Sequence, residues 1–215
     1  MLDRDAYFRR WAELHGGYDP GASAMARSWL SVVYAVARRC GGVPPLAVTV
    51  AGLAAAIAVP LLAHPRTAGL LIAASLTAVL SGFLDSLDGA VAVVRGRDTR
   101  LGYVLDSVAD RLADSAYVVA LWLLGAPGWL CVVAGGAAAL QEYVRARAGA
   151  AGMREIGVVT VFERPTRVIL AAVTALASAA VTGSADFLAT VAAIVWLVLA
   201  GIGLIQVLLA VRRLT

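Results

Sequence analysis

The sequence predicts an all-α integral membrane protein in which six transmembrane helices follow an amphipathic helix at the membrane surface. Three observations support this fold class. The 215-residue chain is 61% hydrophobic and 15% charged, whereas an ordinary soluble domain is about 45–50% apolar and about 25% charged. The apolar residues gather in runs of roughly the 20 residues that a membrane helix needs. Seventeen of the 18 arginines fall in segments that such helices would place on one side of the membrane.

The N-terminal part differs from the rest of the chain. We expect residues 1–22 to form a cytoplasmic extension, because three arginines and two aspartates precede Trp11 and no signal-peptide pattern follows. Residues 23–215 form the membrane domain. Its first segment, 23–40, has apolar residues three and four apart and basic residues near its ends, which is typical of an amphipathic surface helix; a plain transmembrane helix is the alternative. The apolar positions are Met25, Trp29, Val32, Val33 and Val36.

Six membrane spans are expected between about residues 46 and 211. A run at Ser115–Gln141 is too long for one span and contains Gly125-Ala126-Pro127-Gly128, which predicts a turn between two helices. The first of these two helices must begin near Thr99 to be long enough, so it carries acidic residues into the membrane. Four other runs meet the length requirement without a charge: Leu46–Ala63, Thr67–Leu84, Val168–Ala185 and Phe187–Val211.

The charged residues predict the orientation. Only Arg66 among the arginines and Asp186 among the 14 acidic residues fall on the side opposite the rest. By the positive-inside rule, the arginine-rich face is cytoplasmic. We therefore expect a multi-pass protein of the cell membrane whose active site and termini face the cytoplasm. The net charge of +4 reflects this topology and does not indicate a nucleic-acid partner.

Acidic residues lie at helical spacing near the cytoplasmic ends of the second and third spans. Asp85 and Asp88 share one helical face, and Asp106 and Asp110 share another. The connection is short, so the helices are antiparallel and the two acidic faces meet. Clustered intramembrane carboxylates are costly unless they are protonated or neutralised by cations.

Oxygen ligands without histidine or cysteine favour Mg²⁺, Mn²⁺ or Ca²⁺ over zinc. We expect two such ions, Mg²⁺ or Mn²⁺, that clamp a diphosphate. Gly89 and Gly102 leave room for a ligand beside the acids. The alternative is that acids pair with nearby arginines, which suits Asp98 in the connecting loop. For Asp114, one turn from Arg111, both interpretations remain open.

The spacing of these residues resembles the signature of the CDP-alcohol phosphotransferase (CDP-alcohol phosphatidyltransferase) family. The resemblance implies transfer of a phospho-alcohol from a CDP-linked donor to an acceptor hydroxyl, with release of CMP, by a homodimer. Where the family has an arginine this chain has Val93, with Arg95 and Arg97 as candidate replacements. By position, the resemblance implies a two-metal centre of Asp85, Asp88, Asp106 and Asp110, with Asp110 as the catalytic base, and a cytidine site lined by Gly89, Ala92 and Gly102.

A second polar cluster resembles the actinobacterial phosphatidylinositol-phosphate synthase branch of that family. The patterns are Tyr-x-Arg-Ala-Arg at 143–147 and Glu-Arg-Pro-x-Arg at 163–167. This resemblance implies CDP-diacylglycerol as the donor, inositol phosphate as the acceptor, and Arg145 and Arg164 as its phosphate-binding residues. An arginine expected in the last span is absent from 187–211. The alternative role of the arginines is to anchor lipid headgroups.

The predicted function is therefore that of a membrane enzyme of phospholipid biosynthesis, with inositol phosphate or glycerol phosphate as the acceptor. Its partners are a CDP-linked lipid donor, a small polar acceptor and membrane lipids. Two alternatives stay open. Intramembrane carboxylates also serve cation or proton transporters, and Val93 is compatible with a catalytically impaired relative of the family. His15 and His64 are assigned no role.

Overall fold

The computed structural model describes residues 2–14, 23–40, 42–96, 99–153, 159–181 and 183–213. The part of the chain that it describes is all helix and connecting loop, which confirms the all-α class. Among the described helices, α3, α4 and α8 are long and apolar enough to cross a membrane. The helices are α1 (Arg4–Leu14), α2 (Ala24–Arg39), α3 (Pro45–Ala63), α4 (Ala68–Arg95), α5 (Arg100–Leu123), α6 (Gly128–Ala150), α7 (Arg164–Ala180) and α8 (Ala185–Arg213).

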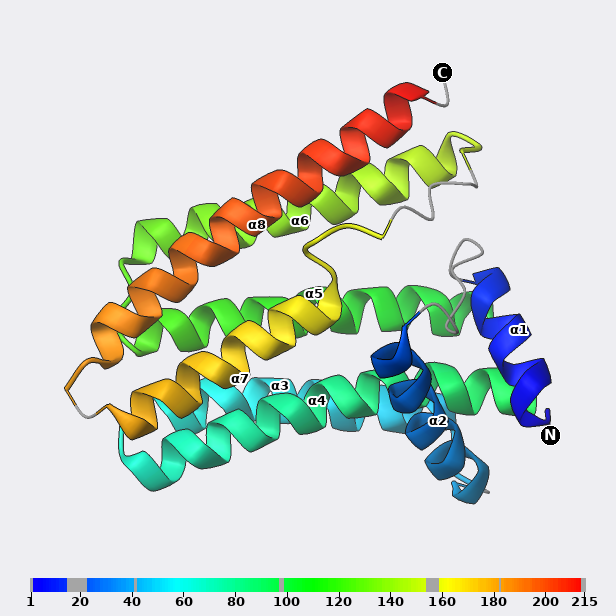
Figure 1. The fold of residues 1–215 in the computed structure, drawn as a ribbon, viewed down its shortest axis with the longest axis horizontal. Helices are drawn as coiled ribbons and strands as arrows, with labels where there is room; N and C mark the ends of the chain where they lie inside the picture. The colour runs from blue at the N-terminus through cyan, green and yellow to red at the C-terminus, as the bar shows by residue number, and fades with distance from the viewer. Residues whose placement is uncertain are drawn as a thin grey trace.

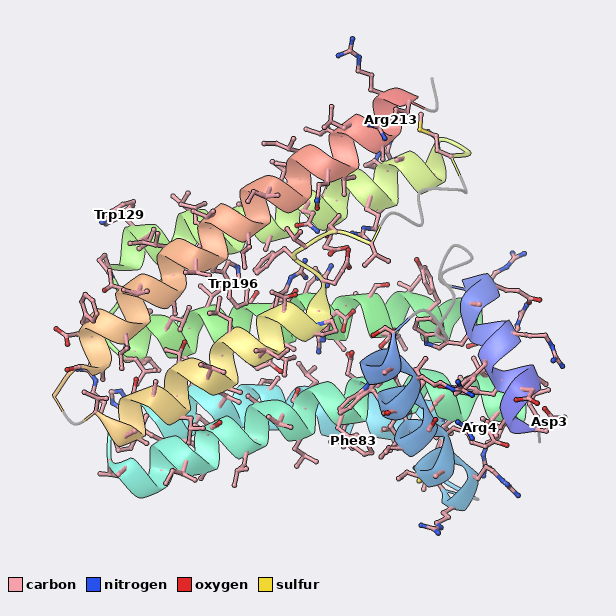
Figure 2. The ribbon with its side chains drawn as sticks, in the orientation of Figure 1. Asp3, Arg4, Phe83, Trp129, Trp196 and Arg213 are labelled. Atoms are coloured by element: carbon pink, nitrogen blue, oxygen red, sulfur yellow. The ribbon has the colours of Figure 1, made fainter. Side chains whose placement is uncertain are left out.

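Helices α3 to α8 run alongside one another, and α1 and α2 lie across one end of this bundle (Figure 1). Helix α3 packs against α4 and α5, α4 packs against α7, and α6 packs against α8. Figure 2 shows Trp196 within the bundle, where its ring meets that of Phe162 edge to face at 5.2 Å. Most other core residues are alanines, which let membrane helices approach closely.

Helices α3 to α8 cover the six segments predicted as spans. Since α5, α6 and α7 are not among the described helices that are long and apolar enough to cross a membrane, the number of six spans stays a prediction. Helix α5 ends at Leu123 and α6 begins at Gly128, as the predicted turn requires. Gly125 in this turn has a φ of 112°. A Cβ atom at that position would lie 2.8 Å from Cβ of Asp186, so only glycine fits. Arg66 also lies beside Gly125, so Arg66 and Asp186 share one end of the bundle, as predicted.

The boundaries of α4 and α7 differ from those of the predicted apolar runs. Helix α4 continues beyond Leu84 to Arg95, because the acidic residues end the apolar run without ending the helix. Gly96 then stops it in the left-handed conformation with a φ of 61°. Helix α7 begins at Arg164 instead of Val168, helped by a proline in its first turn, and ends at Ala180. The acidic and arginine-rich segments are therefore parts of helices.

The apolar residues of α2 are partly buried and partly exposed. Leu30, Val33 and Ala37 are buried against the rest of the protein, whereas Trp29 and Val32 are 40% and 53% exposed. The predicted apolar stripe is thus divided between protein contact and the outer surface. Ser23 caps the N-terminus of the helix, and its hydroxyl accepts a hydrogen bond from the backbone N–H of Ala26.

Helix α1 is anchored to α2 and to the end of α4. The Tyr7 ring is buried and stacks on Tyr34 at 5.2 Å, and burial raises the pKa of Tyr7 to about 12. The backbone N–H of Leu2 donates to the carbonyl of Val94, and the Tyr34 hydroxyl donates to the carbonyl of Leu2. The extension therefore packs on the helix that carries Asp85 and Asp88. His15, Arg97 and Asp98 lie outside the described residues.

Candidate metal and substrate site

Helices α4 and α5 bring three of the four predicted metal ligands together. Asp85 projects from α4, and Asp106 and Asp110 project from adjacent turns of α5. One carboxylate oxygen from each lies within 4.8 Å of the others, and all three side chains are partly exposed. This spacing suits oxygen ligands that share a hard divalent cation.

Asp88 is not part of this group of three acids and is deeply buried, with 4% of its surface exposed. Its Oδ1 accepts a hydrogen bond from the backbone N–H of Gly89 at 2.5 Å. Its Oδ2 is buried and has no hydrogen-bond partner among the described residues. A buried carboxylate oxygen without a donor is costly, and a bound cation would satisfy it. The acids that are present therefore fit a divalent metal.

The predicted cytidine-site residues leave the backbone beside the acids open. Gly89 is exposed, and a Cβ atom there would meet no atom within 4 Å. Ala92, one turn further on, is partly exposed. Gly102 is exposed, and its N–H donates to the Thr99 hydroxyl, which caps α5. The three residues thus offer a side-chain-poor surface beside the carboxylates.

Arg164 lies directly against the predicted metal ligands. Its Nη2 is 3.1 Å from Oδ1 of Asp85, and its Nη1 is 2.8 Å from Oδ1 of Asp110. Nη1 also donates to the backbone carbonyl of Asp110 at 2.9 Å. The structure therefore places this predicted acceptor residue in contact with the acids, from the first turn of α7.

Arg145, the other predicted acceptor residue, is paired within its own polar cluster. Its Nη2 donates to Oε1 of Glu163 at 2.6 Å. The same oxygen accepts hydrogen bonds from the backbone N–H and the hydroxyl of Thr160. Gln141, fully buried on α6, donates in turn to the Thr160 hydroxyl. These bonds fix the segment that leads into α7, and with it the position of Arg164.

Arg167, the last residue of the pattern at 163–167, forms the centre of a buried ion-pair network that its spacing did not predict. Its side chain is fully buried, and it donates to Oδ2 of Asp114 at 2.6 Å and to Oε1 of Glu142 at 2.8 Å. Its guanidinium also lies over the Phe162 ring, 5.0 Å from the centroid. Arg111 contacts Asp114 and Glu142 as well, both at 3.3 Å. Asp114 is therefore an ion-pair partner of arginines, the second of the two interpretations left open.

Val93 is buried at the junction of α1, α2 and α4. A pocket of about 520 Å³ lies at this junction, between α1 and the end of α4, and Arg95 lines it. Arg95 therefore lies near Val93, the position at which the family has an arginine. Arg97 lies outside the described residues. The residues that line the pocket are Leu2, Ala6, Arg9, Arg10, Glu13, Val93, Val94, Arg95 and Gly96.

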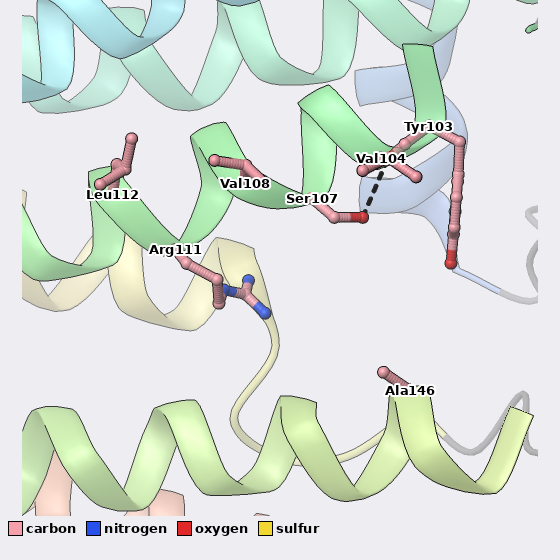
Figure 3. Close-up of a pocket in the computed structure, with 7 residues that line it drawn as sticks. All are labelled: Tyr103, Val104, Ser107, Val108, Arg111, Leu112 and Ala146. Atoms are coloured by element: carbon pink, nitrogen blue, oxygen red, sulfur yellow. Dashed lines mark hydrogen bonds between the residues drawn. The ribbon is translucent and has the colours of Figure 1, made fainter. Parts of the chain in front are cut away.

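An open groove of about 470 Å³ separates α5 from α6 (Figure 3). Its lining is mostly apolar and includes Val104, Val108 and Leu112 of α5 and Ala146 of α6. Arg111 lies at this groove and also joins the buried ion-pair network. The groove therefore borders the ion-pair network of Arg111, Asp114 and Glu142.

The sequence is similar to curated proteins that are named as synthases of inositol phosphate lipids. Phosphatidylinositol phosphate synthase of Mycobacteroides abscessus is 36% identical over 139 residues, which are 60% of this chain and 60% of that protein. Archaetidylinositol phosphate synthase of Methanothermobacter thermautotrophicus is 39% identical over 103 residues, 47% of this chain and 52% of that protein. The chain thus matches less than two thirds of the length of these relatives.

Two solved structures of the phosphatidylinositol phosphate synthase of Mycobacterium tuberculosis share the fold. Both superpose with a TM-score of 0.67 at 29% sequence identity and cover 84% of this chain. One holds manganese and citrate, and the alignment covers 88% of its chain. The other holds CDP-DAG, with 94% of its chain covered. The CDP-alcohol phosphatidyltransferase family model matches residues 43–213, so α3 to α8 and the acidic site lie within the match. The chain therefore belongs to the CDP-alcohol phosphatidyltransferase family.

Proposed function

We propose that this protein transfers a phosphatidyl group from CDP-diacylglycerol to the hydroxyl of a small phosphorylated polyol and releases CMP. The observation that carries the proposal is the meeting of Asp85, Asp106 and Asp110, with one oxygen of each within 4.8 Å of the others. The CDP-DAG in the mycobacterial structure supports the donor. The names of the relatives support inositol phosphate as the acceptor, and glycerol phosphate is the second candidate.

Asp85, Asp88, Asp106 and Asp110 would hold the divalent ions, which we take to be two Mg²⁺ or Mn²⁺. The all-oxygen donor set and the unpartnered Oδ2 of Asp88 support this assignment. When bound, such ions offset the negative charge of a diphosphate and polarise its phosphorus–oxygen bonds. Manganese in the neighbouring mycobacterial structure is consistent with this chemistry.

The chain's own residues would supply proton transfer and binding. A carboxylate oxygen of Asp110 accepts the proton of the acceptor hydroxyl. The acceptor oxygen then bonds to the phosphorus of the phosphatidyl group, while the bond from that phosphorus to the bridging oxygen breaks. CMP leaves with the bridging oxygen. Gly89, Ala92 and Gly102 line the cytidine site, and Arg145 and Arg164 bind the acceptor phosphate, because guanidinium groups make bidentate contacts to phosphate.

The proposal includes a membrane arrangement. Helices α3 to α8 cross the bilayer, α2 lies at its cytoplasmic surface, and residues 1–22 form a cytoplasmic extension of the domain 23–215. The site and both termini face the cytoplasm, and the protein acts as a homodimer. The apolar surfaces of α3, α4 and α8 support the membrane location.

The decisive test is release of CMP by the purified protein. CDP-diacylglycerol and Mg²⁺ are supplied with inositol phosphate, glycerol phosphate or no acceptor, and the lipid product is identified by mass spectrometry. We expect CMP and one phosphatidyl product with one of the two acceptors. No CMP with either acceptor, together with no binding of CDP-diacylglycerol, would refute the proposal. Ion flux through proteoliposomes without nucleotide would favour a transporter instead.

A further inference from the structure

Arg164 places one guanidinium between two of the acids proposed as metal ligands. Nη2 contacts Asp85 of α4 at 3.1 Å, and Nη1 contacts Asp110 of α5 at 2.8 Å. The two helices are thereby joined through the first turn of α7. Only 15% of the Arg164 side chain is exposed, so the two ion pairs form away from bulk water, where screening is weak.

Helix α7 itself does not stabilise the positive charge of Arg164. The first turn of α7 contains no acidic residue. A cation at a helix N-terminus opposes the helix dipole and costs rather than contributes stability. The carboxylates of Asp85 and Asp110, which belong to other helices, therefore hold the guanidinium in place.

The neighbouring arginines have acidic partners of a different kind. Arg167 is paired with Asp114 at 2.6 Å, and Arg145 is paired with Glu163 at 2.6 Å. Neither of these acids belongs to the proposed metal ligands. Arg164 reaches Asp114 only at 3.6 Å. Its close carboxylate partners are thus the acids that a metal would also need.

We propose that Arg164 and a divalent cation compete for Asp85 and Asp110, so that metal loading releases the guanidinium for the anionic acceptor. This inference rests on the proposed function and adds an order of events to it. A divalent ion bound to these carboxylates repels a guanidinium held at hydrogen-bond distance from the same oxygens. Without metal, Arg164 offsets the mutual repulsion of the acids. With metal, Arg164 loses these partners and takes an anion instead, so the metal binds before the phosphorylated acceptor.

Metal affinity tests the competition directly, without measuring activity. The detergent-solubilised protein is stripped of metal, and free Mn²⁺ is followed by electron paramagnetic resonance during titration. Replacing Arg164 by Ala removes the competing cation, and we expect Mn²⁺ to bind at least about ten-fold more tightly, the scale of one charge-assisted hydrogen bond. Unchanged or weaker Mn²⁺ binding would overturn the inference.

The matched control is Arg111→Ala. Arg111 lies 3.7 Å from Asp110 and carries the same charge, but no ion pair to Asp85 is found for it among the described residues. We expect this variant to tighten Mn²⁺ binding by less than about three-fold, because a pair at that distance and exposure is weak. Equal tightening in Arg111→Ala and Arg164→Ala would overturn the inference, since it would reflect net charge alone.

Arg164→Gln provides a second variant if the alanine variant fails to fold. Glutamine keeps much of the side-chain volume and lacks the charge, so Mn²⁺ should again bind more tightly than to the unchanged protein. The two proposals fail differently. Absence of Mn²⁺ binding to the unchanged protein would remove the metal centre and with it the proposed function. Mn²⁺ binding that Arg164→Gln leaves unaltered would remove only the competition.

Discussion

Nη1 of Arg167 lies 2.6 Å from Oδ2 of Asp114, and this buried ion pair ties the first turn of α7 to the middle of α5. Glu142 of α6 completes the arrangement at 2.8 Å from Nη2. Three helices therefore meet at one guanidinium. Because α7 also carries Arg164 and α5 also carries Asp110, the pair fixes the relative position of two proposed site residues that lie far apart in the sequence.

Arg167→Ala should lower the free energy of unfolding by about 3–5 kcal/mol, because it leaves the buried Asp114 and the half-buried Glu142 without the guanidinium that bonds to both. The melting temperature of the solubilised protein measures this effect. Arg167→Lys should recover only part of it, since an ammonium group cannot reproduce the fork of guanidinium bonds. The exposed Arg147→Ala is the control and should melt within about a degree or two of the unchanged protein. Equal melting of the Arg167 and Arg147 variants would contradict the structural role.

Asp110→Asn should slow CMP release by at least about 100-fold, because the proposed base can no longer accept a proton. Single-turnover release of CMP from CDP-diacylglycerol measures the loss. The matched control is Asp186→Asn, since Asp186 lies beside Gly125, whose turn is at the other end of the bundle. That variant should retain its rate. A normal rate in Asp110→Asn would remove this residue from the mechanism.

Gly89→Leu should abolish CMP binding without destabilising the fold. A side chain at this position meets no protein atom within 4 Å of its Cβ, and leucine favours a helix more than glycine does. The new side chain would instead fill the proposed cytidine site. Gly69→Leu is the control, because Gly69 is also on α4 and has equally open surroundings. Isothermal titration should show CMP binding in the Gly69 variant and none in the Gly89 variant; binding in both would place the nucleotide elsewhere.

Val93→Arg should detach α1 from the rest of the protein. Val93 is buried with Tyr7 in the cluster at the junction of α1, α2 and α4, and a guanidinium without a partner there is costly. Hydrogen exchange should rise across residues 4–14, and limited proteolysis should remove this segment faster. Tyr7→Ala should give the same result by removing the aromatic anchor. If α1 stays protected in Val93→Arg, the arginine is accommodated, and its rate of CMP release then reports whether the family residue improves turnover.

Gly203→Ala should destabilise the contact between α6 and α8 by about 1–3 kcal/mol. A Cβ atom at Gly203 would lie 2.5 Å from Oε1 of Gln141, whose side chain is fully buried and bonded to Thr160. Gly201→Ala on the same helix meets no atom within 4 Å and should be neutral or slightly stabilising. Opposite melting shifts of the two variants would support this packing, and equal shifts would contradict it.

Local patterns predicted much of the helical fold and the acidic cluster. Apolar runs indicated α3 to α8, and the spacing of Asp106 and Asp110 placed both on one face of α5, as observed. The extension of α4 to Arg95 was harder to predict, since polar residues end a hydropathy signal whether or not the helix ends. The packing of α1 on α2 and α4 left little trace in the sequence pattern, because its main anchor is the single buried ring of Tyr7.

The pairing of the arginines could not be predicted from spacing alone. Arg164 and Arg167 contact acids on α4, α5 and α6, and helical periodicity carries no information about which distant helix a face meets. One signal was available: two arginines in the first turn of α7 oppose the helix dipole. Such a placement indicates that carboxylates from other helices surround them.

Helix α4 is a single helix of 28 residues, about 42 Å long at about 1.5 Å per residue, whereas the hydrocarbon core of a bilayer is about 30 Å thick. Asp85 and Asp88 lie in its second half, toward the Arg95 end. In the proposed reaction, the site would thus bind a lipid donor that diffuses only within the membrane plane and a polar acceptor that diffuses freely in water. The rate should therefore follow the mole fraction of CDP-diacylglycerol in the membrane rather than its amount per volume, so dilution of the donor with inert lipid would slow the enzyme at constant bulk concentration.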